Sequence, residues 1–377
     1  MGEIWFWQRM VTPHMALLAS ELASLGLVVT YVAEQSMSSE RLAQGWVVPD
    51  LLGVNLRYAK DPAIASKLAA HASVDSVHLC QGIRANGCIG QAQEVLKARG
   101  LRQWVVMEAV DDDGWRGTLK RLVYRRLFAK WRRHIRGVMA IGLNTSSWVV
   151  AHGVKQSCVF PFAYFLDDFE FITIDDVDAS KPFRFLFVGN FIERKKIDLL
   201  LSSLSLICTS KFELLIVGSG PLELSLKDLA ERNLPRCVRW IGCLPSNQVW
   251  REMVKADCLV LPSRHDGWGA VISEAMLCGT PVICSDACGA AGVVHASGKG
   301  GVFKAGDRDD LKHNLERMIE LGRVKKDDRL SLSMWARCLG AKAGASYLLD
   351  ILKYDAGSNK VPMPPWNEKS SKWAVDA

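Results

Sequence analysis

Two carboxylates flank a glycine-rich loop in the second half of this 377-residue chain. Asp266 stands just before Gly267 and Gly269, and Glu274 follows about one turn into the next predicted helix. Glycines let a backbone approach a ligand closely, and the first turn of a helix directs free N–H groups at an anion. The two acids are suited to accept hydrogen bonds from sugar hydroxyls. The segment therefore predicts a site for a nucleotide sugar, which needs amides for its diphosphate and acceptors for its hydroxyls.

The elements around this loop must position it. Residues 259–261 read as a buried strand, residues 270–277 as a short helix, and residues 282–284 as the next strand. Strand, loop, helix and strand in this order build a parallel α/β sheet, which binds ligands at the carboxyl ends of its strands. An ordinary turn of this kind with solvated acids is the alternative interpretation.

The spacing of the acids carries a resemblance to a known family. Asp266, seven residues and Glu274, followed by A-M-L-C-G-T-P-V-I, resembles the signature of the retaining glycosyltransferases of family four. The usual pattern has Glu at the first position, so Asp266 is a variant shorter by one methylene. The resemblance implies an α/β protein of two Rossmann-like, doubly wound domains facing a cleft, the GT-B fold. It also implies sugar transfer with retention at the anomeric carbon, with no metal and no other cofactor.

A second motif of the same family lies around residue 190. The run V-G-N-F-I-E-R-K-K resembles the family element G-R-x-x-x-x-K-G, in which a basic pair holds the leaving diphosphate. Lys195 stands at the Lys position, Asn190 replaces the usual Arg, and Arg194 is an adjacent cation. The resemblance implies that Lys195 and Arg194 stabilise the negative charge of the departing diphosphate. A surface lysine ahead of a helix is the alternative.

Two further turns, I-V-G-S-G-P-L-E and I-G-C-L-P, resemble family turns that face the cleft and read the nucleotide base. In this scheme Asp266 orients the sugar hydroxyls and is expected to be catalytic together with Glu108, while Glu274 holds the ribose. The expected donor-binding residues are Gly189, Arg194, Lys195, Gly218, Gly220, Cys243, Leu244, Gly267, Trp268, Gly269 and Glu274.

The first half of the chain resembles the family only loosely. Its first loop has R-M-V-T-P-H where many relatives have a Gly-Gly pair, and His14 either reaches the acceptor side of the cleft or caps a helix. Glu108 ends a predicted strand where relatives commonly place His or Glu, with a solvated strand-end acid as the alternative. Asp111, in the run 111–113, is interpreted as a contact to the acceptor. Such a run also suits Mg²⁺, but in transferases of a different fold, so no metal site is expected.

A basic stretch covers residues 118–137. It predicts a helix with apolar residues on one side and eight Lys or Arg over the remainder. An anionic membrane surface would suit such a helix, and a core helix with a solvated basic face is the alternative. Nucleic acid is not expected, because no base-stacking module or groove-binding element accompanies the cations. The apolar residues are Leu119, Leu122, Val123, Leu127, Phe128 and Trp131.

Composition sets the class of protein. Hydrophobic residues make up 49% and charged residues 23% of the chain, and the net charge is +7, as in ordinary folded proteins. No apolar run is long enough to span a bilayer, and the first residues do not resemble a secretory signal. Eleven scattered cysteines without a C-x-x-C pair predict reduced thiols. We therefore expect a cytoplasmic protein, with peripheral attachment to the inner face of the cytoplasmic membrane as an option.

The length suits two domains. The expected organisation is an acceptor-side domain over residues 1–165, an acidic linker over 166–182, a nucleotide-sugar domain with five strands over 183–330, a helix over 331–354 that crosses back to the first domain, and a loosely ordered tail over 355–377.

These observations lead to one expected activity. The protein is expected to transfer a hexose from a nucleoside-diphosphate sugar to a saccharide or lipid-linked acceptor, in polysaccharide or glycolipid biosynthesis. A nucleotide-sugar epimerase of the same fold is an alternative that would need no second substrate. A catalytically weak partner subunit that only binds the nucleotide sugar is another, left open by Asp266 and Asn190.

Overall fold

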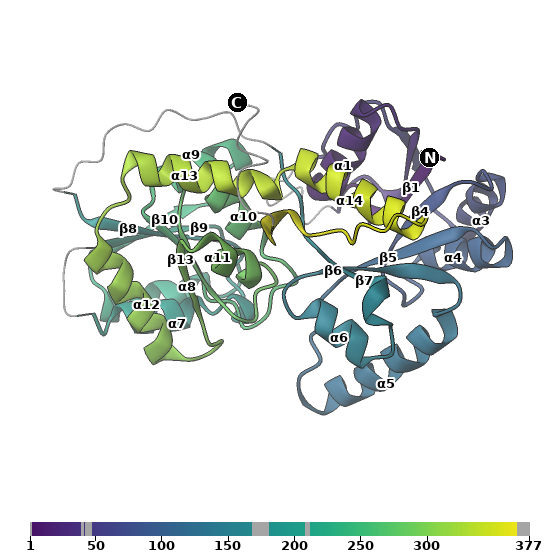
Figure 1. Ribbon diagram of the computed structural model, residues 1–377. Helices are drawn as coiled ribbons and strands as arrows, with labels where there is room; N and C mark the ends of the chain where they lie inside the picture. The colour runs from purple at the N-terminus through teal and green to yellow at the C-terminus, as the bar shows by residue number, and fades with distance from the viewer. Residues whose placement is uncertain (1, 39–40, 42–46, 168–180, 208–211, 368–377) are drawn as a thin grey trace. The chain divides into compact units, whose positions relative to one another are not determined.

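The described residues of this computed structural model form two compact units (Figure 1). The structure describes residues 2–38, 41, 47–167, 181–207 and 212–367. The N-terminal unit consists of the described residues up to 167 together with Gly340–Pro365, and the C-terminal unit consists of those from 181 to 339 together with 366–367. Most of the predicted linker, residues 168–180, and the end of the predicted tail lie outside the described residues.

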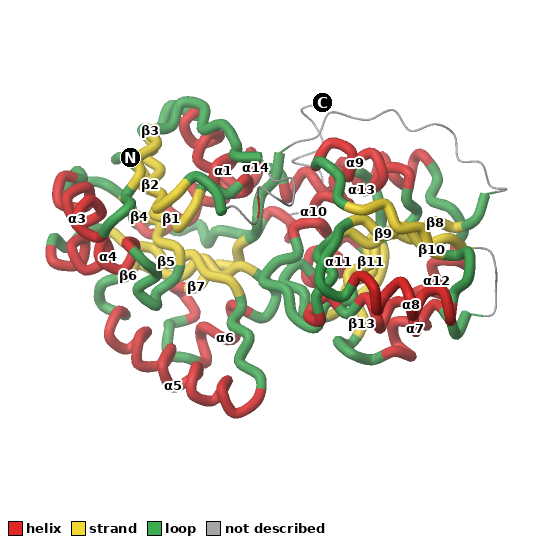
Figure 2. Tube along the Cα trace, turned by 180° about the vertical axis from the view of Figure 1, so that it is seen from behind, coloured by secondary structure: helices red, strands yellow, loops and turns green. Residues whose placement is uncertain are grey.

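The N-terminal unit contains a seven-stranded parallel sheet with the strand order β3-β2-β1-β4-β5-β6-β7. Helices α3 to α6 cover one face, and α1 and α14 cover the other (Figures 1 and 2). The strands are β1 (Ile4–Met10), β2 (Val29–Gln35), β3 (Asn55–Tyr58), β4 (Val77–Gln81), β5 (Arg102–Glu108), β6 (Ile135–Ile141) and β7 (Val159–Phe162). The helices are α1 (Pro13–Ser24), α3 (Pro62–His71), α4 (Cys88–Ala98), α5 (Gly114–Trp131), α6 (Thr145–Ala151) and α14 (Ala341–Asp355).

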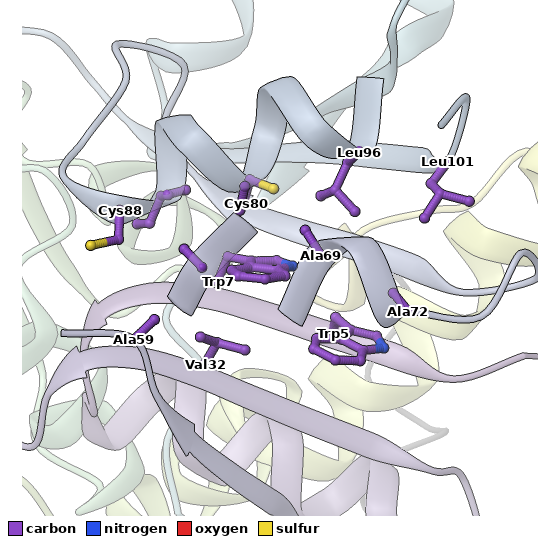
Figure 3. Close-up of a cluster of buried hydrophobic side chains, with 13 residues drawn as sticks. Trp5, Trp7, Val32, Ala59, Ala69, Ala72, Cys80, Cys88, Leu96 and Leu101 are labelled. Atoms are coloured by element: carbon purple, nitrogen blue, oxygen red, sulfur yellow. The ribbon is translucent and has the colours of Figure 1, made fainter. Parts of the chain in front are cut away.

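The central strand β1 is buried on both faces, which explains why its sequence is apolar without alternation. Trp5 and Trp7 point to one face, where their rings stack with centroids 5.7 Å apart beneath α3 and α4 (Figure 3). Phe6 points to the opposite face and stacks on Tyr31 of β2 at 5.9 Å. This packing fixes the start of β1, and with it the loop that follows the strand.

The C-terminal unit contains a six-stranded parallel sheet with the order β10-β9-β8-β11-β12-β13. The strands are β8 (Phe183–Val188), β9 (Phe212–Val217), β10 (Val238–Gly242), β11 (Cys258–Leu261), β12 (Val282–Ser285) and β13 (Gly300–Phe303). The helices are α7 (Ile197–Leu204), α8 (Glu223–Asn233), α9 (Ser246–Lys255), α10 (Ala270–Leu277), α11 (Ala291–Ser297), α12 (Arg308–Leu321) and α13 (Lys326–Ala336).

Both sheets start in the middle and wind outward in two directions. The strand order reverses between β1 and β4 in the N-terminal unit and between β8 and β11 in the C-terminal unit. Two Rossmann-like, doubly wound sheets are therefore present, and this part of the fold prediction is confirmed. At such a reversal the loops of two neighbouring strands diverge to opposite faces, which leaves room for a ligand at the carboxyl ends.

Several predicted elements differ from the structure. The C-terminal unit has a sixth strand, β13, where a loop was predicted. The prediction missed it because the strand begins with two glycines, which are typical of loops. The single helix predicted over residues 331–354 is two helices, α13 and α14, separated by a turn at Arg337–Leu339. In the part of the predicted tail that the structure describes, Pro362, Pro364 and Pro365 are buried.

Helix α5 buries only part of the apolar side that its sequence predicts. Phe128 and Trp131 are buried, whereas Leu119 and Leu122 are 55% and 48% exposed. The C-terminal end of α5 thus packs on the sheet, and its first turns present apolar side chains to solvent. None of the helices among the described residues combines the length and the apolar character needed to cross a bilayer.

Candidate functional site

Charged side chains meet where the strand order of the C-terminal unit reverses. Lys195, in the 3-10 turn Glu193–Lys195 after β8, places its Nζ 2.6 Å from Oδ2 of Asp266 in the loop after β11. Arg194 places a terminal guanidinium nitrogen 3.4 Å from the same oxygen and donates a hydrogen bond of 2.6 Å to the backbone oxygen of His265. The two predicted cations and the first predicted acid are therefore held together.

This cluster carries an excess of positive charge in a half-enclosed environment. The side chains of Lys195 and Asp266 are 13% and 14% exposed, and that of Arg194 is 37% exposed. Two cations face one carboxylate, so the cluster has a formal charge of +1. Water screens charges weakly when they are mostly enclosed, so an anion at this edge would be attracted strongly.

The loop after β11 is held by the loop after β12, a support that the sequence analysis did not identify. The backbone N–H of Asp266 donates to the oxygen of Ala287 at 3.1 Å, and Gly289 N–H donates to the oxygen of Asp266 at 2.9 Å. A side chain on Gly289 would lie 1.9 Å from the oxygen of Gly267. The sequence signal was present in the run D-A-C-G directly after β12.

Gly269 allows the loop to enter helix α10. It is the N-cap of this helix with φ of +86°, a conformation that favours glycine. Its neighbour Trp268 buries its indole, whose Nε1 donates to the Ser273 hydroxyl at 3.0 Å, and stacks obliquely on Trp366 at 6.3 Å. The buried ring of Trp268 therefore anchors the loop, whereas its backbone forms part of the loop itself.

Glu274 lies one turn into α10 and is a partly buried residue. Burial of the carboxyl group raises its pKa to about 7. Among the residues that the structure describes, we find no hydrogen bond or ion pair to this carboxylate. A carboxyl group in this situation is an acceptor whose charge would be stabilised by hydroxyl donors.

The turns after β8, β9 and β10 lie along the same edge. Gly218 N–H donates to the oxygen of Gly242 at 2.9 Å, and a Cβ at Gly218 would lie 2.0 Å from the oxygen of Gly189. Backbone thus touches backbone between these turns. Cys243 is exposed and lies 3.1 Å from the Ser219 hydroxyl through its Sγ. Gly220 and Leu244 occupy the same two turns.

The N-terminal unit brings together Glu108, His14 and one residue that the sequence analysis missed, Tyr164. The Tyr164 hydroxyl donates to Oε1 of Glu108, which is the last residue of β5. The Tyr164 ring stacks on the His14 ring with centroids 3.6 Å apart and an angle of 24°. Burial, together with the nearby charge of Arg41, lowers the pKa of His14 to about 3, so its imidazole is neutral at physiological pH.

Asp111 is not part of this cluster in the contacts of the described residues. Its backbone oxygen accepts a hydrogen bond from Lys120 of α5. The neighbouring Asp112 pairs with Arg121 at 3.2 Å and accepts from Trp148 Nε1 at 3.0 Å. The acidic run therefore holds the basic helix through Lys120 and Arg121. In the described part of the chain, no three His, Cys, Asp or Glu residues are arranged to hold a metal ion.

Comparison with known proteins identifies a family whose model matches part of this chain. Residues 169–332 match the model of the family described as glycosyl transferases group 1. The amylovoran biosynthesis glycosyltransferase AmsK of Erwinia amylovora is 29% identical over 149 residues, which is 37% of each chain. This chain spans between 36% and 39% of the length of the first curated relatives that it matches.

Solved structures match almost the whole chain. The apo form of the lipopolysaccharide outer core galactosyltransferase WaaB has a TM-score of 0.72 at 16% identity, covering 93% of this chain and 99% of the other. The HepE protein of Anabaena in complex with UDP has a TM-score of 0.71 at 13% identity, covering 94% and 100%. These similarities show that the chain has the GT-B fold.

Proposed function

Because residues 169–332 belong to the glycosyl transferases group 1 family, we propose that this protein is a retaining glycosyltransferase. It transfers a sugar, of hexose type, from a nucleoside diphosphate to a hydroxyl of a saccharide or lipid-linked acceptor. The observation that carries the proposal is the cluster of Lys195, Arg194 and Asp266 at the strand reversal of the C-terminal unit. Its excess positive charge suits a diphosphate, and the topology favours a ligand at this point.

Each group of this edge has a proposed task toward the donor. Lys195 and Arg194 stabilise the charge that develops on the departing diphosphate, which is the main electrostatic demand of the reaction. Asp266, held beside them, accepts hydrogen bonds from hydroxyls of the transferred sugar. Glu274 accepts from the ribose hydroxyls, which stabilises its charged form. The backbone of the loop at residues 267–269 and the first turn of α10 approach the phosphates.

The proposed chemistry balances without a further reagent. The bond between the anomeric carbon and the diphosphate oxygen breaks, and a bond from that carbon to the acceptor oxygen forms on the same face. The acceptor proton passes to the departing phosphate oxygen. Glu108 of the N-terminal unit then serves to orient the acceptor or the donor sugar rather than to act as the base.

The test is a transfer assay with labelled nucleotide sugars and a membrane lipid extract. Label that enters the lipid or saccharide fraction, and that is lost with Asp266→Ala, supports the proposal. Label that stays in the free sugar, with only the identity of that sugar changed, supports an epimerase instead. Binding of a nucleotide sugar by calorimetry without any turnover supports a partner subunit. The absence of both binding and turnover across the donor panel would contradict all three.

We also propose that helix α5 attaches the protein to an anionic membrane surface, on the cytoplasmic side, where a lipid-linked acceptor would be met. Support comes from Trp115, Leu119 and Leu122, which are 72%, 55% and 48% exposed at spacings of four and three residues. Arg125 and Arg126 follow on the next turn. Apolar side chains insert into the headgroup region, while each cation adds about 1 kcal/mol near anionic lipid.

Vesicle sedimentation tests the attachment. The protein should bind vesicles that contain phosphatidylglycerol, bind less as salt rises, and bind pure phosphatidylcholine weakly. Replacing Leu119 and Leu122 by Ser should reduce binding about tenfold or more, since two apolar side chains no longer insert. Leu224→Ser is the matched control, because Leu224 is 85% exposed on α8 in the other unit. Equal binding by all three proteins would contradict the role of α5.

A further inference from the structure

Tyr164 stands out in the segment that follows β7. Its neighbours Phe162, Ala163, Phe165 and Leu166 are buried, whereas Tyr164 itself is only partly buried. A single partly exposed tyrosine within an otherwise buried run has a side chain directed out of the core. The segment lies at the carboxyl end of the sheet, where ligands bind in folds of this class.

Helix α14 fixes this segment from the other side. The backbone N–H of Ala341 donates to the oxygen of Leu166 at 2.8 Å, and Leu166 forms a parallel bridge with Gly340. The Phe165 ring lies directly on the backbone of α14, because a Cβ at Gly344 would be 2.3 Å from Cγ of Phe165. Tyr164 is thus placed by packing on both sides and is not a freely moving loop residue.

Tyr164 connects groups from distant parts of the edge. Its ring stacks on His14 at 3.6 Å, and its hydroxyl donates to Oε1 of Glu108. His14 begins α1 after β1, and three strands, β4, β5 and β6, separate β1 from β7 in the sheet. His14 is held in turn by the Thr12 hydroxyl, 3.3 Å from its Nε2.

We propose that Tyr164 is a positioning residue for the acceptor, acting through Glu108 and His14. This proposal rests on the proposed glycosyltransferase function. The hydroxyl fixes the orientation of the Glu108 carboxylate, and the ring fixes the plane of the imidazole. Together they offer one rigid surface with a carboxylate, a neutral imidazole and an aromatic ring. Such a surface suits a neutral, hydroxyl-rich molecule, which needs hydrogen-bond partners and an apolar face rather than a counter-ion.

Two substitutions separate the two contacts of Tyr164. Tyr164→Phe keeps the ring on His14 and removes only the hydroxyl, while Tyr164→Leu removes both contacts. In the transfer assay, with the labelled nucleotide sugar held constant and the lipid extract titrated as acceptor, we expect Tyr164→Phe to raise the acceptor KM about tenfold. Tyr164→Leu should raise it further, to about a hundredfold. The dissociation constant of the nucleotide sugar, measured by calorimetry, should change by less than about twofold, because the donor groups lie in the other unit.

A double-mutant cycle shows whether Tyr164 acts through Glu108. Once Glu108→Gln is present, adding Tyr164→Phe should cause little further loss, since the orienting bond to the carboxylate is already changed. Tyr58→Phe is the matched control, because it removes a hydroxyl from an exposed tyrosine elsewhere in the same unit. Thermal unfolding of each variant detects a general loss of structure.

The outcomes separate this inference from the function on which it rests. If the wild-type protein transfers sugar and Tyr164→Phe leaves the acceptor KM within twofold, the role of Tyr164 is wrong and the function stands. The role of Tyr164 would also be wrong if the effects of Tyr164→Phe and Glu108→Gln on the acceptor KM were equal and simply added in the double variant. If the wild-type protein transfers nothing, the proposed function fails and this inference fails with it.

Discussion

The two sheets carry chemically different groups at the same topological edge. In the C-terminal unit, ions on the loops of two adjacent strands, β8 and β11, meet in the Lys195–Asp266 pair. In the N-terminal unit, groups that follow β1 and β7 meet the last residue of β5 through a neutral stack and one hydroxyl, in the cluster of His14, Tyr164 and Glu108. The first arrangement suits a charged ligand, and the second suits a neutral ligand with many hydroxyls.

This difference explains why the two edges should respond differently to substitution. Removing one member of a largely buried ion pair leaves an uncompensated charge, which costs several kcal/mol. Removing one hydroxyl from a hydrogen-bonded cluster costs about 1–3 kcal/mol. Substitutions at the charged edge should therefore have the larger effects, and they should act on the donor alone.

The largest effect is expected for Lys195→Met. The substitution removes one of two cations that face Asp266, so the cluster can no longer compensate the charge of a departing diphosphate. We expect the transfer rate to fall about 10²- to 10³-fold, with a weaker affinity for the nucleotide sugar. Steady-state kinetics and calorimetry with the same donor measure both.

The next residue provides the control for this prediction. Lys196 pairs with Asp198 at 2.9 Å on the surface, and its side chain is 33% exposed. Lys196→Met removes the same charge from the same turn without touching Asp266 and should change the rate by no more than about threefold. If both substitutions had equal effects, general attraction by positive charge would explain the edge, and the specific pair would not.

A second, smaller effect is expected at Glu274 and should depend on pH. Burial raises the pKa of this carboxyl to about 7, so much of it is protonated at pH 6. If ribose hydroxyls donate to the charged form, binding lowers the pKa, and the affinity for a nucleotide sugar rises as pH increases from about 5.5 to 8. One pKa unit corresponds to a tenfold change. Calorimetry with a nucleoside-diphosphate sugar avoids the titration of a terminal phosphate.

Glu274→Gln should remove this pH dependence, because the amide does not titrate. The same variant tests the pKa through stability. A carboxyl whose folded pKa exceeds its unfolded value of about 4.5 destabilises the folded state progressively as pH rises from 4.5 to 7. The glutamine variant should therefore gain stability relative to wild type over that window, by about 1–3 kcal/mol. A pH-independent affinity in the wild type would contradict the ribose contact.

The contrast between the edges also shows what a sequence can reveal. Asp266, Lys195 and Glu274 lie in contiguous motifs that end strands, so residue type and spacing were sufficient to select them. The pairing of Lys195 with Asp266 was not predictable, because it depends on β8 and β11 being neighbours. Tyr164 lies in the apolar run F-P-F-A-Y-F-L, where a tyrosine reads as core. The contacts of this segment with α14, far along the chain, and of Tyr164 with Glu108 and His14 follow from tertiary structure and not from the local pattern.

Short-range patterns failed for a different reason at the strand and helix boundaries. Strand β13 begins with glycines, which have low strand propensity, and β3 is largely exposed, so neither shows an apolar run. The described part of the tail is rich in proline and looked unstructured. Its Trp366 nevertheless packs against Trp268, a contact that follows from tertiary structure alone.

Trp366→Ala should have a moderate effect, limited to the charged edge. Without the indole that packs on Trp268, the loop at residues 267–269 loses one of its supports, while the bond from Trp268 Nε1 to Ser273 remains. We expect the affinity for the nucleotide sugar to fall about three- to tenfold, as for partial loss of a contact between aromatic rings. The acceptor KM should stay within twofold. A larger effect on the acceptor than on the donor would contradict the assignment of Trp366 to this edge.

The smallest effect is expected for Cys243→Ser. If the backbone of residues 243 and 244 reads the nucleotide base, replacing Sγ by a hydroxyl should leave the affinity for the nucleotide sugar within about twofold, because serine can keep a hydrogen bond to Ser219. A loss of tenfold or more would show that the thiol itself contacts the base.

A second experiment at Cys243 tests where the nucleotide base binds, rather than which group contacts it. Cys243 is the one exposed thiol among the cysteines that the structure describes, so iodoacetamide should modify it first. The bulky adduct at the carboxyl end of β10 should weaken nucleotide-sugar binding strongly, even though Cys243→Ser does not. A bound nucleotide sugar should in turn slow the modification. Protection without any effect of serine would place the base against the backbone of this turn. Modification that proceeds at the same rate with and without donor would place the base elsewhere and leave the charged edge to bind the phosphates alone.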